Sequence, residues 1–373
     1  MKANRAPRGA ARPGTPRRGG AAVAASATPS TRAAPHKSKA AGTGAAIPRI
    51  QGYLYDAAAQ DREIAVTRKA IAGLHDRKIL WIDLAKRDAE EIRELGDLLG
   101  LDRRTVQALA KPRDGLRLDN YGAYLQFAAL TAPRSVGGGL ATPEDRRIDF
   151  VIGQNWVLTV HAADVAYLQG FRAQDKGDTE TGALSAPALG ASLLDWHLEE
   201  YFTEVSKVEA AIDELDERIL AAPSEELLLE EILQIRRRSS RLRRTLMTQR
   251  SVFYGLGRPD LGQVVDSEAS EAFASLANRF ERAVDEAEHT RDLSVGSFEL
   301  FTSRSAQQTN ELVKALTFFT VIIGTTAAVA GLFGMNFDPP FFQTGSAGFF
   351  AVTIGLLVVG LSAWIVGRRR RWI

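Results

Sequence analysis

ALTFFTVIIGTTAAVAGLFGMNF, residues 315–337, has no charged side chain and ends in Gly-Met-Asn-Phe. A helix needs roughly 20 apolar residues to cross the hydrocarbon core of a bilayer, and residues 315–335 meet that requirement. A second apolar run occupies residues 348–367, so only residues 336–347 separate the two runs. The sequence therefore predicts a hairpin of two transmembrane helices, with the Gly-Met-Asn tripeptide at the turn between them.

The basic tail at residues 368–373 predicts which way this hairpin faces. Its arginines directly follow the second span, and basic residues close to a span are retained on the cytoplasmic side. Because both ends of a hairpin lie on one side, we expect both termini in the cytoplasm and the tripeptide at the outer surface of the cell (inner) membrane. An organelle membrane is the alternative, because residues 1–48 are rich in arginine and free of acidic residues, as transit peptides are.

The composition excludes several classes of site. The chain has 373 residues, a formal net charge of +2 and no cysteine, which excludes disulfides and thiolate metal sites. The five histidines include no pair at the spacing of metal ligands, and no catalytic constellation is visible. We therefore expect neither a cofactor nor an enzyme. Residues 1–48 have little apolar surface to bury and are expected to form a disordered basic tail.

Residues 49–187 alternate between short strands and helices, which predicts an α/β cytosolic domain. The strands are expected at Lys78–Leu84, Tyr121–Leu130, Ile148–Ile152 and Trp156–His161. A helix is expected near Asp88–Leu99, where apolar residues recur at helical spacing. His161, at the end of a strand, is expected to have a structural role.

Residues 188–314 predict a charged helical stalk region. The run Leu193–Leu220 has an apolar stripe at a spacing of three and four residues, opposite an acidic face at Glu199–Glu217. The next helix carries a basic run at Arg236–Arg244. An antiparallel pairing of the acidic and basic helices is the favoured explanation of both runs. Nucleic-acid binding by the arginines is the alternative, and no aromatic residues are interleaved with them to support it.

One long helix is expected to join this stalk to the membrane. No proline occurs between Ser267 and Pro339, so a helix from Ser267 to Phe333 would be roughly 100 Å long. Small and polar side chains recur along one of its faces at Asn310, Val313, Thr317, Thr320, Gly324, Ala327 and Gly331. Two explanations fit this stripe. It is either a close helix–helix seam or the inner wall of a pore shared between identical helices.

Two segments of this helix resemble the CorA family of divalent-cation transporters. They are Thr309–Thr317 (TNELVKALT) and Gly331–Phe337 (GLFGMNF). The resemblance covers about residues 50–373, and Gly-Met-Asn at the end of the first of two spans is highly specific. It implies an α/β cytosolic domain, a long helical stalk and two C-terminal transmembrane helices, assembled in the lipid bilayer as a funnel-shaped homopentamer.

The resemblance also implies roles for single residues. Gly334, Met335 and Asn336 match the selectivity motif at the outer mouth, where Asn336 would hold a hydrated ion through its water shell. Glu299 falls at the cytosolic entrance, and Asp338 is the acidic residue of the outer loop. The pore-lining positions implied by the resemblance and the stripe are Asn310, Val313, Leu316, Thr317, Thr320, Gly324, Ala327 and Gly331. Mg²⁺ prefers oxygen ligands and loses water reluctantly, so a ring of neutral amide oxygens would capture the hydrated ion and still release it.

The expected function is influx of Mg²⁺, with Co²⁺ and Ni²⁺ as further ions and no nucleic-acid partner. The Asp-x-x-Asp-His pattern that supplies a regulatory cytosolic Mg²⁺ site in the family falls here at Ser275, Asn278 and Arg279, so it is not reproduced. We therefore expect weak closure by internal Mg²⁺. Two alternatives remain open: a Zn²⁺ transporter of the same fold, as in the ZntB branch, and a membrane-anchored scaffold without ion flux.

Overall fold

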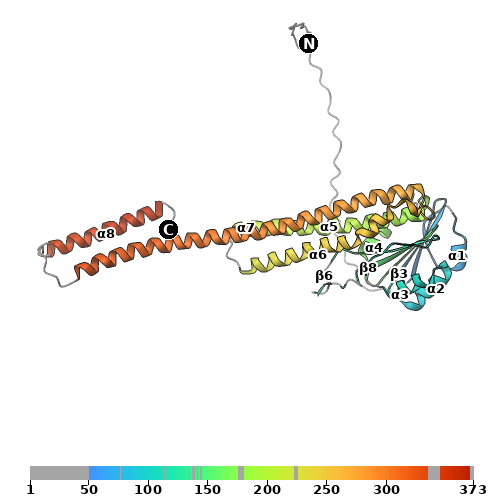
Figure 1. The fold of residues 1–373 in the computed structure, drawn as a ribbon, viewed down its shortest axis with the longest axis horizontal. Coiled ribbons are helices and arrows are strands. Elements are labelled where there is room, and N and C mark those ends of the chain that lie inside the picture. The colour runs from blue at the N-terminus through green and yellow to red at the C-terminus, as the bar shows by residue number, and fades with distance from the viewer. Residues whose placement is uncertain are drawn as a thin grey trace, which may run out of the picture. The chain divides into compact units, whose positions relative to one another are not determined.

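The computed structural model describes residues 50–75, 77–112, 115–133, 135–136, 139–140, 142, 145–174, 180–221, 226–334 and 345–369. Within these residues, a sheet with flanking helices is followed by three long helices and a final apolar helix (Figure 1). The predicted α/β domain, helical stalk and pair of C-terminal apolar helices are therefore confirmed. The homopentamer stays a prediction, and the basic segments at residues 1–48 and 370–373 lie outside the described residues.

The α/β domain is built on a seven-stranded mixed sheet with the strand order β2-β1-β3-β9-β8-β5-β4. Its strands are β1 (Ile50–Asp56), β2 (Arg62–Ile64), β3 (Lys78–Ala85), β4 (Asp119–Asn120), β5 (Leu125–Leu130), β8 (Arg147–Ile152) and β9 (Trp156–His161). Strands β3 and β9 pair in parallel, and the other neighbours pair antiparallel. A separate two-stranded ribbon is formed by β6 (Ser135–Val136) and β7 (Gly139–Leu140).

One predicted strand is wrong in its extent. The expected strand Tyr121–Leu130 starts four residues too early, because residues 121–124 connect β4 to β5 as a turn and only Leu125–Leu130 is a strand. Gly122 adopts a positive φ of 80°, and its backbone N–H donates to the side-chain oxygen of Asn120 at 2.8 Å. An Asn side chain that bonds the backbone two residues on favours a turn over a continuing strand.

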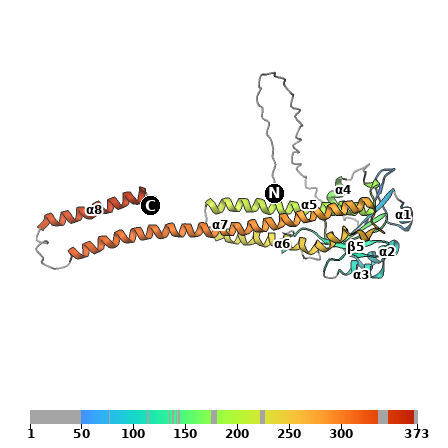
Figure 2. The same ribbon diagram turned by 45° about the horizontal axis from the view of Figure 1, so that its top comes forward.

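Helices cover both faces of the sheet (Figure 2). One face packs against α1 (Arg68–Ala72), α2 (Ala89–Leu99) and α3 (Arg103–Ala110), in a core that includes Leu80, Ile82, Ile92, Leu95, Leu109, Val151 and Leu158. The opposite face packs against α4 (Ala166–Gln174) and α5 (Ala186–Ala221), in a core that includes Trp81, Phe127, Phe150, Leu194 and Tyr201. The short helix η1 (Glu180–Ala183) precedes α5.

The boundaries of α2 follow from its sequence. Asp88 caps the first turn, because its carboxylate accepts hydrogen bonds from the backbone N–H groups of Glu90 and Glu91 at 2.9 and 3.2 Å. Gly100 ends the helix in the left-handed conformation, with φ of 68°, which glycine adopts without strain. The helix predicted near Asp88–Leu99 is confirmed.

The stalk consists of α5, α6 (Glu226–Leu256) and α7 (Ser267–Phe333), which pack against one another. The short helix η2 (Pro259–Leu261) separates α6 from α7, and Pro259 is its first residue. Helix α7 has the predicted bounds, and its 67 residues span roughly 100 Å at 1.5 Å per residue. Its N-terminal half buries an apolar stripe against α5 and α6 that includes Phe273, Leu276, Phe280, Ala283 and Ala287.

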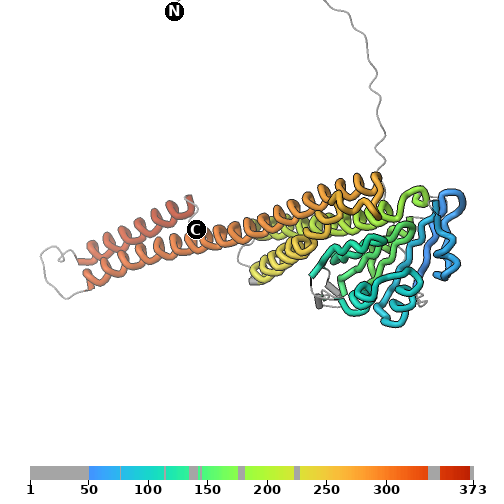
Figure 3. Tube along the Cα trace, turned by 45° about the vertical axis from the view of Figure 1, so that its right-hand side comes forward, coloured from blue at the N-terminus to red at the C-terminus, as the bar shows by residue number. Residues whose placement is uncertain are grey.

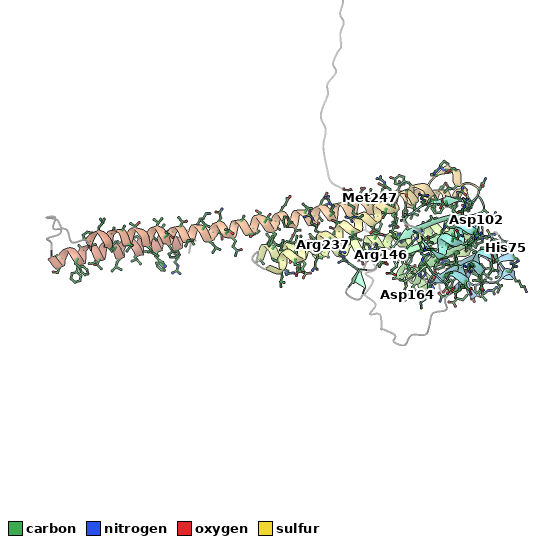
Figure 4. All side chains as sticks on the ribbon, turned by 60° about the horizontal axis from the view of Figure 1, so that its bottom comes forward. His75, Asp102, Arg146, Asp164, Arg237 and Met247 are labelled. Carbon is green, nitrogen blue, oxygen red and sulfur yellow. The ribbon has the colours of Figure 1, made fainter. Side chains whose placement is uncertain are left out.

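The predicted pairing of the acidic and basic helices is confirmed only in part. Arg238 of α6 forms an ion pair with Glu204 of α5 at 2.8 Å, and Arg243 reaches Glu288 of α7 at 3.3 Å. Four other arginines of the basic run line an open groove on α6 together with Leu233 and Ser240: Arg236, Arg237, Arg241 and Arg244. Figure 4 labels Arg237 on this helix. The acidic residues of the neighbouring helices therefore neutralise only part of the positive charge of the basic run.

A buried polar network joins α5 and α6 to the sheet. The side-chain oxygen of Gln249 accepts from the backbone N–H of Leu130 at 2.8 Å and lies 3.1 Å from Nε2 of His197. The amide nitrogen of Gln249 donates to the hydroxyl of Tyr201 at 3.0 Å, and that hydroxyl donates to the carbonyl of Leu130 at 2.6 Å. Burial lowers the pKa of His197 to about 4, against the smaller opposing effect of its bond to Gln249.

We predict that acid destabilises the protein through His197. Because its pKa is about 4 in the folded state and 6.5 as the ordinary value, the unfolded chain binds the extra proton in between. The contribution of His197 to the free energy of unfolding is therefore fully present above pH 6.5. It is lost progressively as the pH drops towards 4, by roughly 3 kcal/mol in total. Thermal unfolding of His197→Gln, which keeps a donor towards Gln249, should show a flatter pH profile than the wild type.

The matched control for this prediction is His289→Gln, because His289 is exposed on α7. Its unfolding temperature should follow the wild-type pH profile. If His197→Gln also follows that profile, another group is responsible for the loss of stability in acid.

Candidate functional site

The small-residue stripe predicted from the sequence lies on the membrane-spanning half of α7. Its members are exposed in the isolated chain: Asn310, Val313, Leu316, Thr317, Thr320, Gly324, Ala327 and Gly331. At 3.6 residues per turn, these positions fall on one side of the helix. Nothing within 4 Å would meet a side chain added at Gly324 or Gly331. The chain itself therefore leaves this stripe uncovered.

The opposite side of α7 faces α8 (Gly345–Arg369), which runs back along it (Figure 3). The partly covered residues of α7 in this segment are Ala315, Phe318, Ile322, Thr326 and Val329. Those of α8 are Gly348, Val352, Leu356, Gly360, Ala363 and Gly367. Four of these six are glycine or alanine, which allows close approach of helix backbones. The seam within the hairpin is thus made by α8, and the stripe of α7 is not needed for it.

Helices α7 and α8 are both long and apolar enough to cross a membrane. Their large apolar side chains are exposed in the isolated chain, including Leu312, Val321, Ile323, Leu332, Phe349 and Leu357. Contiguous exposed apolar surface of this kind needs lipid or another subunit to cover it. Both helices are therefore consistent with the predicted membrane hairpin of residues 315–335 and 348–367.

The first residue of the predicted selectivity motif marks the end of α7. The backbone N–H of Gly334 donates to the carbonyls of Ala330 and Gly331 at 3.0 and 3.2 Å, which closes the last turn of the helix. Met335, Asn336 and Asp338 lie outside the described residues. The motif therefore begins three residues after Gly331, the last position of the stripe.

Glu299 lies on the same long helix, before the membrane-spanning half. Its side chain is exposed, and its carbonyl accepts a hydrogen bond from the hydroxyl of Thr302 at 2.9 Å. An exposed carboxylate at this position on α7 is compatible with the predicted cytosolic entrance. The role of Glu299 at that entrance stays a prediction.

The positions of the missing regulatory pattern contain no carboxylate, and the last of them is the cation Arg279. The guanidinium of Arg279 donates to Asp195 at 3.1 Å and forms a further ion pair with Glu199, both on α5. Two acidic residues of the stalk are therefore neutralised within the chain. Among the described residues, no group of three or more His, Cys, Asp or Glu side chains could hold a metal ion.

A second charged cluster was not predicted from the sequence. Asp83 on β3 is buried, and its carboxylate is held by Arg172 of α4 at 2.6 Å, by Nε2 of His161 at 3.1 Å and by the hydroxyl of Thr159. Burial opposes ionisation, but the bond from His161 and the nearby positive charges outweigh it and hold the pKa of Asp83 below its ordinary value. Nδ1 of His161 lies 2.7 Å from the carbonyl of Ala163. The expected structural role of His161 is confirmed.

The sequence is similar to those of known proteins. The family model described as CorA-like Mg²⁺ transporter protein matches residues 76–370. The cobalt/magnesium transport protein CorA of Thermotoga maritima is 26% identical over 182 residues, which cover 49% of this chain and 51% of that protein. The protein of the same description from Methanocaldococcus jannaschii is 23% identical over 331 residues, which cover 85% of this chain and 98% of that protein.

The fold is also similar to a solved structure of a relative. The complete structure of the CorA magnesium transporter from Methanocaldococcus jannaschii matches with a TM-score of 0.67 and 19% identity, covering 86% of this chain and 98% of that one. This likeness concerns the arrangement of the sheet domain, the stalk and the two apolar helices. Because the family model also matches most of the sequence, the chain belongs to the CorA-like Mg²⁺ transporter family.

Proposed function

We propose that this protein conducts divalent cations through a homopentameric pore, with Mg²⁺ as the principal ion and Co²⁺ and Ni²⁺ as further ions. The pore wall is the stripe from Asn310 to Gly331 on α7, and Gly334, Met335 and Asn336 select the ion at the outer mouth. Glu299 lies at the cytosolic entrance, and Asp338 attracts cations on the outer side. The bilayer in question is the cell (inner) membrane, with both termini in the cytoplasm.

The observation that carries this proposal is the division of α7 into two sides. Helix α8 covers the side at Ala315, Phe318 and Ile322, whereas the side with Thr317, Thr320 and Gly324 is left open. Hydroxyl and backbone oxygens along an open face suit hydrated cations, because Mg²⁺ prefers oxygen ligands and keeps several of its waters. A face meant for lipid would instead carry large apolar side chains.

The driving force is the inward-negative membrane potential. It contributes about 2.3 kcal/mol per elementary charge for each 100 mV, and therefore about 4.6 kcal/mol for a divalent ion. No cofactor or enzymatic step is needed for such passage.

Ion flux into proteoliposomes tests the proposed function. The purified protein should admit Mg²⁺ when the vesicle interior is negative, and uptake should stop when the potential is collapsed. Uptake of Zn²⁺ without Mg²⁺ would support the alternative of a zinc transporter of the same fold. Absence of flux for every divalent ion tested, from a correctly assembled protein, would support the non-conducting scaffold.

We predict that internal Mg²⁺ closes this protein weakly. Ser275, Asn278 and Arg279 stand where the family pattern has its two regulatory aspartates and its histidine, and Arg279 binds Asp195 and Glu199 within the same chain. Bound ions would therefore not be required to screen repulsion between subunits at this position. Proteolysis of the cytosolic part should proceed at nearly the same rate with and without millimolar Mg²⁺. A large gain in protection with Mg²⁺ would show that another set of carboxylates senses the ion.

A further inference from the structure

A cavity of about 1010 Å³ opens in the α/β domain, on the face of the sheet that α2 and α3 cover. Its walls come from α3, from the segment that follows α3, and from β4, β5 and β8. Pockets for small molecules have volumes of roughly 300–1,000 Å³, so the cavity is large enough for one. None of its lining residues belongs to α7 or α8, and the proposed ion pathway does not use it.

Four cationic side chains line this cavity, and three of them remain besides Arg147, which pairs with Asp149. Arg104 is on α3, Lys111 follows the last residue of α3, and Arg117 precedes β4. All three are exposed, and none of them forms an ion pair with another described residue. Arg117 faces the cavity because its neighbours Leu116 and Leu118 pack on the opposite side, against the core with α5, α6 and α7. The convergence of three cations therefore follows from the local fold.

The negative groups beneath these cations are already compensated. Asp149 lies at the floor of the cavity and is 0% exposed, and Arg87 and Arg147 hold its carboxylate at 2.6 and 2.8 Å. Arg87 also donates to the carbonyl of Leu109 at 2.9 Å, near the carboxyl end of α3. The carboxyl end of a helix carries a partial negative charge, which would otherwise disfavour an anion. Asp119, at the edge, is the remaining acidic residue among those that line the cavity.

One wall of the cavity offers an aromatic surface. The ring of Tyr121 lines the cavity and stacks on Tyr124, with centroids 4.8 Å apart and an interplanar angle of 18°. The amides of Gln107 and Gln126 also line it. Stacked rings and amides of this kind bind flat, polar ring systems.

We propose that this cavity binds a phosphate-bearing small molecule of the nucleotide class. Arg104, Lys111 and Arg117 would bind the phosphates, because guanidinium and ammonium groups form charge-assisted hydrogen bonds with phosphate oxygens. The ring-bearing remainder of the ligand would lie against Tyr121. The site is independent of the proposed ion pathway, and its occupancy is measurable without ion flux.

Binding of a fluorescent ATP analogue to the full-length protein in detergent tests this proposal. The titration is carried out in EDTA, so that chelation of Mg²⁺ by the nucleotide has no effect on the protein. The wild type should bind the analogue saturably, and ATP should displace it. The double variant Arg104→Ala/Arg117→Ala should bind roughly tenfold more weakly or worse, because two charge-assisted contacts are lost.

The matched control is Arg103→Ala. Arg103 is the neighbour of Arg104 on the same helix and is equally exposed, but it does not line the cavity. It should bind the analogue as the wild type does. Both variants remove surface charge only, and unchanged thermal unfolding verifies that each is folded.

Competition identifies which part of the ligand is recognised. If ATP is the better competitor, the ring contributes to binding, as proposed. If pyrophosphate displaces the analogue as well as ATP does, the cavity recognises the phosphates alone, and the assignment to the nucleotide class is wrong. The proposal is overturned if no saturable binding occurs, if adenosine competes as well as ATP, or if Arg103→Ala weakens binding as much as the double variant.

Discussion

Replacing Asn336 with alanine is expected to reduce uptake of Mg²⁺ into proteoliposomes to about the background rate. In the proposed mechanism, its carboxamide oxygen holds the water shell of the incoming ion, and alanine provides no oxygen in its place. The side chain is assigned to ion capture and not to packing, so the variant should assemble as the wild type does. Initial rates at several Mg²⁺ concentrations, together with the mass of the purified assembly, measure both properties.

Asp338→Asn is expected to have a milder effect than Asn336→Ala. A single carboxylate at a solvated mouth acts by long-range attraction, which salt screens. Uptake should therefore fall mainly at low ion concentration and low ionic strength, and should approach the wild-type rate in high salt. Wild-type transport by a correctly assembled Asn336→Ala protein would refute the role given to the motif.

The order and type of the main elements could be predicted from the sequence, because they depend on local patterns such as periodicity and the positions of proline. The absence of proline from Ser267 onwards predicted one continuous helix, and α7 has the predicted bounds. Alternating and helical periodicities located β3, β8, β9 and α2 within a few residues. The strand predicted at Tyr121–Leu130 was placed four residues too early, because an Asn side chain and a glycine with positive φ form a turn there and override the apolar pattern.

Contacts between distant segments were not accessible in the same way. Asp83 and Arg172 are 89 positions apart, and only the register of β3 together with the packing of α4 brings them into contact. The basic run of α6 illustrates the same limit. Composition predicts only that the acidic and basic helices attract each other. Which arginines form ion pairs depends on the side of the helix on which each one lies. Arg238 therefore reaches Glu204, whereas Arg237 and Arg241 line an open groove. The cavity at Arg104 and Arg117 likewise requires the fold of three segments.

The stripe on α7 was predicted with two explanations, a helix–helix seam and a pore wall, and the position of α8 excludes only a seam within the hairpin. A seam between α7 and α8 would place the small residues of α7 against α8. Instead, α8 contributes small residues of its own to the seam, such as Gly360 and Gly367, and meets the side of α7 that carries Phe318 and Ile322. The stripe at Thr320 is left for contacts outside the chain, which supports its assignment to a pore without identifying the ion.

Gly324→Leu is expected to block this pore. Gly324 is exposed in the middle of the stripe, and no atom lies within 4 Å of a side chain added there. In the proposed homopentamer, five leucine side chains would enter the same level of the pore and exclude hydrated ions, so uptake should fall to about a tenth of the wild-type rate or less. Leucine also favours helix more than glycine, by up to about 1 kcal/mol. Loss of flux would therefore not result from unfolding of α7.

Thr325→Leu is the control for this variant, because it adds similar apolar bulk at the next position, about 100° around the same helix. Thr325 is exposed and its hydroxyl bonds only to the carbonyl of Val321 on its own helix, at 2.7 Å, among the hydrogen bonds of the described residues. Its replacement should leave uptake near the wild-type rate. If Gly324→Leu assembles normally and transports as well as Thr325→Leu does, the ions pass along another face, and the stripe from Asn310 to Gly331 is a packing surface between subunits.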